Sequence, residues 1–243
     1  MNNIKISTIF AGFPARSSRG YLGWSSVHLM QVKKETTWTN YLFDTGGFNE
    51  REILLEKLMD LNITPTDIHG VILSHLHFDH AVNWPLFPNA QIYINEKELQ
   101  ENQLDLAVPD FHKQELRKSP NLNLITEKSQ IDGMKVIEAP GHTPGMIALD
   151  IDGKIFASDA IKNRSELTYG PLGQVWNLKE AEASIKKLCD LGHTLYPGHD
   201  VPLIKTDGKW VATVTADETL YLTQNLHDSQ NRQIINLSIP CCQ

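Results

Sequence analysis

The ten residues from Val71 to His80 constrain this chain more than any other feature of its sequence. The first three are apolar, which predicts a short buried strand. Four side chains able to bind metal follow at the exit of that strand: His75, His77, Asp79 and His80. Imidazole and carboxylate groups in such a cluster are the ligands that zinc, iron and manganese take in proteins.

The spacing of these residues suits the end of a strand. In an extended segment, residues i and i+2 lie on one face, roughly 6.6 Å apart along the chain, whereas on a helix they point in nearly opposite directions. His75 and His77 can therefore bind one cation. Asp79 and His80 are adjacent, and a turn there would aim them at a second point nearby. A polar loop with scattered histidines is the alternative, since the chain has ten histidines.

The composition indicates a folded domain. The chain has 243 residues, of which 41% are hydrophobic and 21% charged, so it can bury a large core, and this composition excludes long disordered segments. We expect one domain of the α/β class over residues 1–243. The net charge of −7 argues against nucleic acid as a partner. It fits a site in which acidic residues hold cations, and it fits an ordinary acidic protein equally well.

Three cysteines occur, Cys189 on the apolar side of a predicted helix and Cys241 and Cys242 in what we expect to be a frayed tail. They do not form a disulfide framework. We find neither a signal-peptide pattern nor a transmembrane window, so we expect a cytoplasmic protein with no membrane partner. The oligomeric state stays open.

Alternation and turn residues predict a mixed order of strands and helices. Strands are expected at 4–11, 25–32, 39–43, 71–74, 91–94, 134–138, 146–151, 154–157, 194–196 and 209–214. Capping-box patterns at Asn49 with Glu52 and at Asn177 with Glu180 predict the starts of two helices. A last helix is predicted at 217–226. The polar, helical-looking segment 96–119 could cap a pocket or form an ordinary surface helix pair.

Further polar residues follow other predicted strands. They are Asp44 before a glycine turn, His142 in Gly141–Gly145, Asp159 after Ser158, and His199 in Pro197–Asp200. Residues at these positions would converge with the His75–His80 cluster on one rim of a sheet structure. Asp44 alone could equally be a turn residue. The other five histidines, His28, His69, His112, His193 and His227, lack such settings, and we expect them on the surface or hydrogen-bonded in the core.

The motifs His-x-His-x-Asp-His, Gly-His-Thr-Pro-Gly, Ser-Asp and Gly-His-Asp, in this order from Asp44 to His199, together resemble the metallo-β-lactamase-fold hydrolases. The resemblance implies a four-layer αβ/βα sandwich. It also implies two divalent metal ions, zinc in the first place, with iron, manganese or cobalt as alternatives. The implied ligands are His75, His77 and His142 for one metal and Asp79, His80 and His199 for the other, with Asp159 bridging both and Asp44 orienting the ligands.

The resemblance implies a hydrolase for a small-molecule substrate. A hydroxide shared by the two metals would attack the carbonyl of a small ester, lactone or thioester, and Asp79 could pass a proton to the leaving group. The motifs are similar to those of N-acyl-homoserine-lactone lactonases. Those enzymes often place a tyrosine three residues after the bridging aspartate, where this chain has Lys162, and Tyr169 in the same loop is the candidate for that substrate contact.

A second hypothesis belongs to another class. The same fold could hold metal without hydrolysis, either in a single-iron thiol or persulfide oxygenase or in a metal-bound binding or sensing module. The full set of seven ligands, including Asp159, favours the hydrolase.

Overall fold

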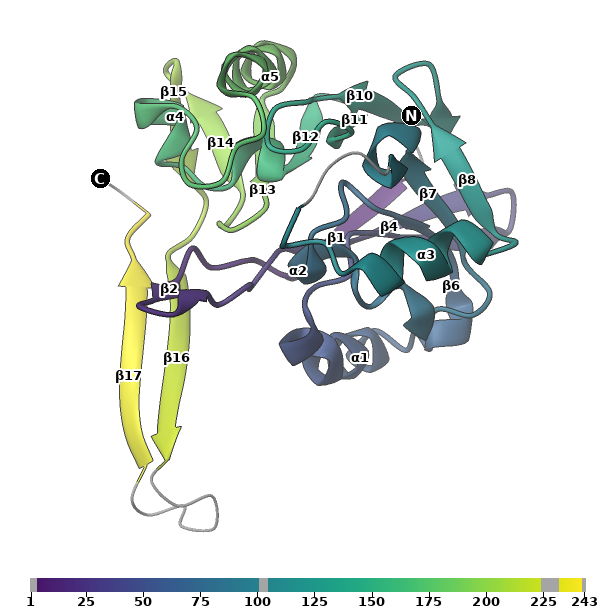
Figure 1. Ribbon diagram of the computed structural model, residues 1–243, viewed down its shortest axis with the longest axis horizontal. Helices are drawn as coiled ribbons and strands as arrows, with labels where there is room; N and C mark the ends of the chain where they lie inside the picture. The colour runs from purple at the N-terminus through teal and green to yellow at the C-terminus, as the bar shows by residue number, and fades with distance from the viewer. Residues whose placement is uncertain (1–3, 101–104, 224–231, 242–243) are drawn as a thin grey trace.

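Two mixed β-sheets form the centre of the computed structural model, which describes residues 4–100, 105–223 and 232–241 (Figure 1). The first sheet has the strand order β1-β4-β5-β6-β7-β8, and its strands are Ile4–Phe10, Val27–Lys34, Thr37–Phe43, Ile68–Ile72, Gln91–Asn95 and Leu122–Ile125. The second has the order β15-β14-β13-β12-β11-β10-β9, with strands Lys209–Ala212, Leu203–Thr206, Thr194–Pro197, Lys154–Ser158, Ile147–Ile151, Met134–Glu138 and Gln130–Ile131.

Helices cover the outer faces of the sheets, α1 and α3 on the first sheet and α5 on the second (Figure 1). The helices are α1 (Arg51–Asp60), α2 (Phe78–Ala81), α3 (Asp110–Lys118), α4 (Glu166–Tyr169) and α5 (Leu178–Leu191). Short 3₁₀ segments are η1 (Phe48–Glu50), η2 (Pro65–Asp67), η3 (Trp84–Leu86), η4 (Glu96–Leu99) and η5 (Asp159–Ile161). Two small hairpins complete the described chain, β2 (Arg16–Ser17) with β3 (Gly20–Tyr21), and β16 (Ala216–Thr223) with β17 (Arg232–Ile239).

The core has three apolar layers, as a four-layer sandwich requires. Met30 and Phe43 of the first sheet pack against Phe156 of the second between the sheets. Leu58 of α1 and other apolar side chains fill the outer face of the first sheet, and Leu188 of α5 packs on the outer face of the second. The predicted αβ/βα sandwich is therefore confirmed.

Strand direction determines where the polar loops lie. β5, β6, β7 and β8 are parallel to one another, and β12 is parallel to β13. The carboxyl ends of parallel neighbours meet at one edge of a sheet, which is where α/β proteins place their sites. The loops that follow β5 and β6 therefore lie at the same edge of the first sheet. The loops that follow β12 and β13 likewise lie at one edge of the second sheet.

Several local predictions hold. The segment 25–43 forms the antiparallel pair β4–β5, and Asp152-Gly153 is the turn between β11 and β12, with positive φ values of 53° and 78°. Asn177 caps α5, because its Oδ1 accepts a hydrogen bond of 3.2 Å from the backbone N–H of Glu180.

One helix prediction is wrong, and the predicted cap of another helix is displaced. The segment predicted as a helix at 217–226 belongs to β16 as far as Thr223, and 224–226 lie outside the described residues. Leu220 and Leu222 are two residues apart, which suits a strand, and β17 supplies the pairing partner from later in the chain. The helix expected to begin at Asn49 begins instead at Arg51. Its N-cap is Glu50, whose carboxylate accepts a 2.8 Å hydrogen bond from the N–H of Gly47.

The remaining cysteines and histidines fall mostly where expected. Cys189 packs, partly buried, against the core of the second sheet, and so does Cys241, which is therefore not part of a frayed tail. His28 is buried beside Thr8, His69 accepts from the backbone of Asn40, and His193 lies on the surface. His112 is partly buried beside Phe111. His227 and Cys242 lie outside the described residues.

Among the described residues, we find no helix with the length and apolar character to cross a membrane.

Candidate metal centre

The seven predicted metal ligands meet at one place, although they come from four separate connections between strands. The connection after β6 supplies His75 and His77 and, within α2, Asp79 and His80. The other three supply His142 between β10 and β11, Asp159 at the start of η5 after β12, and His199 after β13. Three groups of their ligand atoms lie within 4.8 Å of one another: His75 with His77 and His142; His75 with His80 and Asp159; Asp79 with His80 and His199.

Asp159 joins the two halves of this cluster. Its Oδ2 lies 3.2 Å from Nε2 of His142, while its Oδ1 lies 3.3 Å from Nε2 of His80 and 3.3 Å from Nε2 of His199. On the far side of the second half, Oδ2 of Asp79 lies 3.6 Å from Nε2 of His199. Nitrogen ligands about 2.1 Å from a tetrahedral zinc ion are about 3.4 Å apart, so these separations match the spacing of ligands around a cation.

Several polar atoms of the cluster are buried without a partner. Nε2 of His75, Nε2 of His80 and Oδ1 of Asp159 have no hydrogen bond in the described structure. A buried polar atom without a partner costs roughly 1–3 kcal/mol, so native structures seldom leave three together unless an ion or a water molecule satisfies them. The donor set and its orientation therefore fit divalent metal ions.

In each of the five histidines, the ring nitrogen that faces away from the cluster (the outer nitrogen) makes a hydrogen bond. The partners are Ser74 Oγ for His75, Asp105 for His77, Asp44 for His80, the carbonyl of Gln174 for His142 and the carbonyl of Trp24 for His199. His77 differs from the other four, because its Nε2 faces outward and its Nδ1 faces the cluster, 3.0 Å from His142 Nε2. Such outer partners fix the tautomer and the ring orientation of a metal-binding histidine.

Asp44 lies behind His80 and is almost completely buried, at 1% exposure. Its carboxylate accepts hydrogen bonds from the backbone N–H and hydroxyl of Ser74, both 2.8 Å, and from the hydroxyl of Ser158, 2.7 Å. Oδ2 also lies 2.9 Å from Nδ1 of His80. Asp44 thus connects three strand ends, those of β5, β6 and β12. Both Asp44 and Ser158 have positive φ, 59° and 45°, a conformation that is uncommon outside glycine and is often found at functional sites.

The charges of the cluster depend on one another. Burial opposes the ionised form of Asp159, but His199, His80 and His142 outweigh it and hold the pKa of Asp159 well below its usual value. Burial, with a further contribution from the neighbouring His80, keeps the pKa of His75 well below 6.5. A neutral imidazole and an ionised carboxylate are the forms that bind metal.

Two supporting carboxylates were not predicted from the sequence. Asp105 contacts His77, Ala107 N–H and the side-chain amide of Gln174, and His77 holds the pKa of Asp105 below its usual value despite burial. Glu98 is buried and accepts hydrogen bonds from the N–H of Leu76, 3.1 Å, and of Gly145, 2.7 Å. Glu98 therefore ties the loop of His75 and His77 to the loop of His142.

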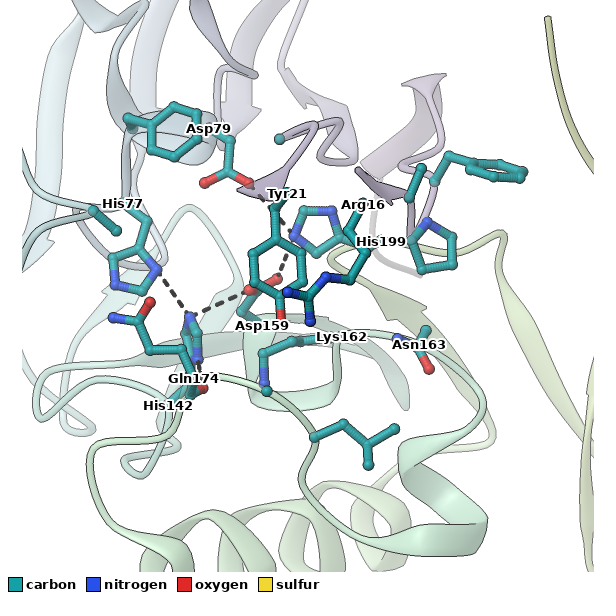
Figure 2. A pocket seen from close by; sticks show the side chains of 18 residues that line it. Arg16, Tyr21, His77, Asp79, His142, Asp159, Lys162, Asn163, Gln174 and His199 are labelled. Carbon is teal, nitrogen blue, oxygen red and sulfur yellow. Dashed lines mark hydrogen bonds and ion pairs between the residues drawn. The ribbon is translucent and has the colours of Figure 1, made fainter. Parts of the chain in front are cut away.

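A cavity of about 800 Å³, counting the part open to solvent, lies over the cluster (Figure 2). His77, Asp79, His142, Asp159 and His199 form its floor, and Lys162 lies in its wall. Tyr169 is 77% exposed and does not line this cavity. The segment 96–119 contributes Ala107 to the wall, while α3 packs on the first sheet through Leu116.

Comparisons with known proteins agree with this geometry. The family model of the metallo-beta-lactamase superfamily matches residues 26–220. A probable metallo-hydrolase from Methanocaldococcus jannaschii is 31% identical over 161 residues, which are 65% of this chain and 70% of the relative. An N-acyl homoserine lactonase from a Bacillus species is 31% identical over 109 residues, which are 42% of this chain and only 40% of the lactonase.

Solved structures show the same fold at lower identity. A Thermotoga maritima protein assigned to the metallo-beta-lactamases superimposes with a TM-score of 0.67 at 22% identity, covering 83% of this chain and 99% of that one. AidC, a dizinc quorum-quenching lactonase, superimposes with a TM-score of 0.61 at 19% identity, covering 87% of this chain and 98% of that one. Because the family match extends over most of its length, the chain belongs to the metallo-beta-lactamase superfamily.

Proposed function

We propose that this protein is a hydrolase that binds two divalent metal ions and cleaves a small ester, lactone or thioester. In this proposal His75, His77 and His142 hold one ion, Asp79, His80 and His199 hold the other, and Asp159 bridges them. Zinc is the first candidate, because imidazole and carboxylate ligands suit it, and iron, manganese and cobalt are the alternatives.

The position of Asp159 carries the proposal. One carboxylate oxygen faces His142 and the other faces His80 and His199, at 3.2 Å and 3.3 Å. A structural zinc site is closed and does not need a carboxylate between two groups of ligands. Here the cluster opens into a cavity, so a substrate could reach it.

The chain's own residues would prepare the site for the reaction. The outer hydrogen bonds of the five histidines turn their other ring nitrogens toward the centre of the cluster, and Asp44 fixes the position of His80. Asp79 lies on the cavity floor, where its carboxylate could carry a proton to a leaving group. When bound, the metal ions would lower the pKa of water and polarise a carbonyl oxygen.

The site and the relatives together support the proposed substrate class. The Bacillus relative and AidC are both named as lactonases. The first is similar to this chain in sequence, and the second has the same fold. N-acyl-homoserine lactones are therefore one candidate substrate, beside other small esters and thioesters. Lys162 occupies the wall beside the site and is a candidate for contact with the substrate.

Metal analysis and a substrate panel test the proposal. We expect two metal ions per chain and turnover of at least one lactone, ester or thioester in a panel that also includes phosphodiesters and β-lactams. Asp159→Asn should abolish turnover, while Asp190→Asn, an exposed carboxylate on α5, should not change it.

Full activity in Asp159→Asn or in metal-free protein would contradict the proposal. One iron per chain with oxygen consumption on thiol substrates would instead support an oxygenase of the same fold.

A further inference from the structure

The wall of the cavity opposite the metal cluster comes from the N-terminal part of the chain. Arg16 and Tyr21 of the β2–β3 hairpin line the cavity together with Phe13 and Ala15 before it and with residues 172–174. In Figure 2 the side chains of Arg16 and Tyr21 extend from the hairpin toward Asp159 and Lys162. The hairpin therefore places an exposed guanidinium group in the lining of the cavity.

Apart from the proposed metal ligands, the charged side chains that line the cavity are basic. The acidic residues in the lining are Asp79 and Asp159, and the basic ones are Arg16 and Lys162. Both acidic residues belong to the proposed ligand set. Two divalent ions would more than neutralise them, so a loaded cavity has a positive formal charge.

The two basic residues differ in their partners. Nζ of Lys162 lies 3.0 Å from Oε1 of Glu166, a carboxylate that is only 1% exposed, so a buried counter-charge holds this ammonium group. Arg16 has no carboxylate within ion-pair distance among the described residues. Its contact is with the ring of Tyr21, whose centroid lies 5.0 Å from the guanidinium carbon.

The contact with Tyr21 uses none of the N–H donors of Arg16. Arg16 and Tyr21 are directly opposite each other in the register of the hairpin, which brings the guanidinium carbon over the ring. A guanidinium in such a contact keeps its N–H groups free, and these donors match the two oxygens of a carboxylate or phosphate. The hairpin thus presents a preoriented donor pair at the entrance.

We propose that Arg16 binds an anionic group of the substrate, so that the preferred substrates are esters, lactones or thioesters that also carry a carboxylate or phosphate. This inference rests on the proposed hydrolase function. It predicts that neutral lactones, N-acyl-homoserine lactones among them, are poorer substrates than anionic ones, because a neutral acyl chain offers no acceptor charge to the guanidinium. Phe13 and Leu172 would contact the apolar part of such a molecule.

Anion binding to the metal-loaded protein tests the inference without turnover. Glutarate and inorganic phosphate are titrated by calorimetry into the wild type, Arg16→Gln and Arg19→Gln. Arg19 lies in the same hairpin turn but outside the cavity lining, so it is a matched control for loss of charge. We expect about tenfold weaker binding of at least one anion in Arg16→Gln and less than a twofold change in Arg19→Gln.

Metal ions also bind both anions, and the comparison of the two variants isolates the guanidinium. A larger effect on glutarate assigns the site to a carboxylate, and a larger effect on phosphate assigns it to a phosphate. Equal binding by all three proteins would overturn the inference.

A pair of matched esters tests the same residue in catalysis. The 4-nitrophenyl ester of valerate is neutral, and the mono-4-nitrophenyl ester of glutarate has a similar length and a free carboxylate. For a carboxylate site, Arg16→Gln should raise KM for the glutarate ester about tenfold with little change in kcat, leave the valerate ester unchanged, and be partly rescued by Arg16→Lys.

Equal effects on the two esters, together with unchanged anion binding, would reject the inference while the hydrolase function stands. If the metal-loaded wild type hydrolyses nothing in the full panel, the proposed function fails, and the titration alone still decides whether Arg16 binds an anion.

Discussion

Oδ2 of Asp105 lies 2.8 Å from Nε2 of His77, on the side of the ring that faces away from the metal cluster. A carboxylate in this position makes the imidazole a stronger ligand and fixes which nitrogen carries the proton. His77 is also the one histidine of the five that turns its Nδ1 inward. The orientation of this ring therefore depends on Asp105.

Asp105→Asn should weaken metal binding. Loss of such an outer partner typically costs about 10- to 100-fold in metal affinity, and we expect a decrease in this range for the more weakly bound ion. Competition with a chromophoric zinc chelator measures it. Asp110→Asn, at the exposed start of α3, is the control and should keep wild-type affinity. Equal affinities in the two variants would show that Asp105 does not support His77.

Gly198→Ala should disturb Asp159 directly. A Cβ at Gly198 would overlap with Oδ1 of Asp159 and would lie 3.0 Å from the carbonyl carbon of Ser158. Glycine is required here for space, because the methyl group would occupy the position of the carboxylate. We expect loss of at least one metal ion per chain, measured by elemental analysis after gel filtration.

Gly208→Ala is the matched control for that substitution. Gly208 lies in the turn between β14 and β15 with a φ of 77°, and a Cβ added there would meet no atom within 4 Å. An alanine there strains the backbone by about 1 kcal/mol and should lower thermal stability without any loss of metal. If both variants keep two ions, the close approach of Gly198 to Asp159 has no effect on the site.

Asp44→Ala should destabilise the fold itself. The substitution leaves the donors of Ser74, Ser158 and His80 without their shared acceptor in the interior, and breaking a buried charged network costs about 3 kcal/mol or more. Asp44→Asn keeps one acceptor oxygen and tolerates the positive φ, so it should lose less. Chemical denaturation of the metal-free proteins gives both values. Equal losses in the two variants would contradict this explanation.

His28 should make the protein less stable in mild acid. Burial lowers the pKa of His28 to about 3, while the unfolded chain protonates near 6.5. Between these two values the unfolded state binds the extra proton, so the free energy of unfolding falls as the pH falls through this window. From pH 6.5 to pH 5 this single group should cost about 2 kcal/mol.

A variant separates His28 from the histidines of the metal cluster. His28→Phe keeps an aromatic ring between Phe156 and Tyr196, whose centroids lie 5.1 Å and 5.2 Å from that of His28. It should reduce the pH dependence of unfolding by that amount, while His193→Phe on the surface should leave it unchanged. The same pH dependence in His28→Phe and the wild type would contradict the assignment.

The sequence predicted the parts of the site that depend on local spacing. His75 and His77 are two residues apart after a strand, and this spacing holds wherever the strand lies. The edge shared by β12 and β13 could also be inferred, because polar residues follow both strands. The αβ/βα fold came from the combination of motifs, since no single strand indicates how two sheets pack.

Contacts between distant segments were not predictable in the same way. Asp105 is 28 residues from His77, and Glu98 is 47 residues from Gly145, and neither carboxylate stands in a motif. The C-terminal strand β16 was predicted as a helix because its partner β17 lies beyond an intervening segment, and pairing between strands decides such a case.

In the proposed two-metal centre, the position of Asp159 between the two groups of ligands would also link the binding of the two ions thermodynamically. A cation that binds between His75, His77 and His142 orients one oxygen of the carboxylate, and the other oxygen then already points toward His80 and His199. Part of the ordering cost of the second site is therefore met when the first is filled. By reciprocity the second ion strengthens the first by the same factor, so we expect positive cooperativity in metal loading, with few chains that hold a single ion.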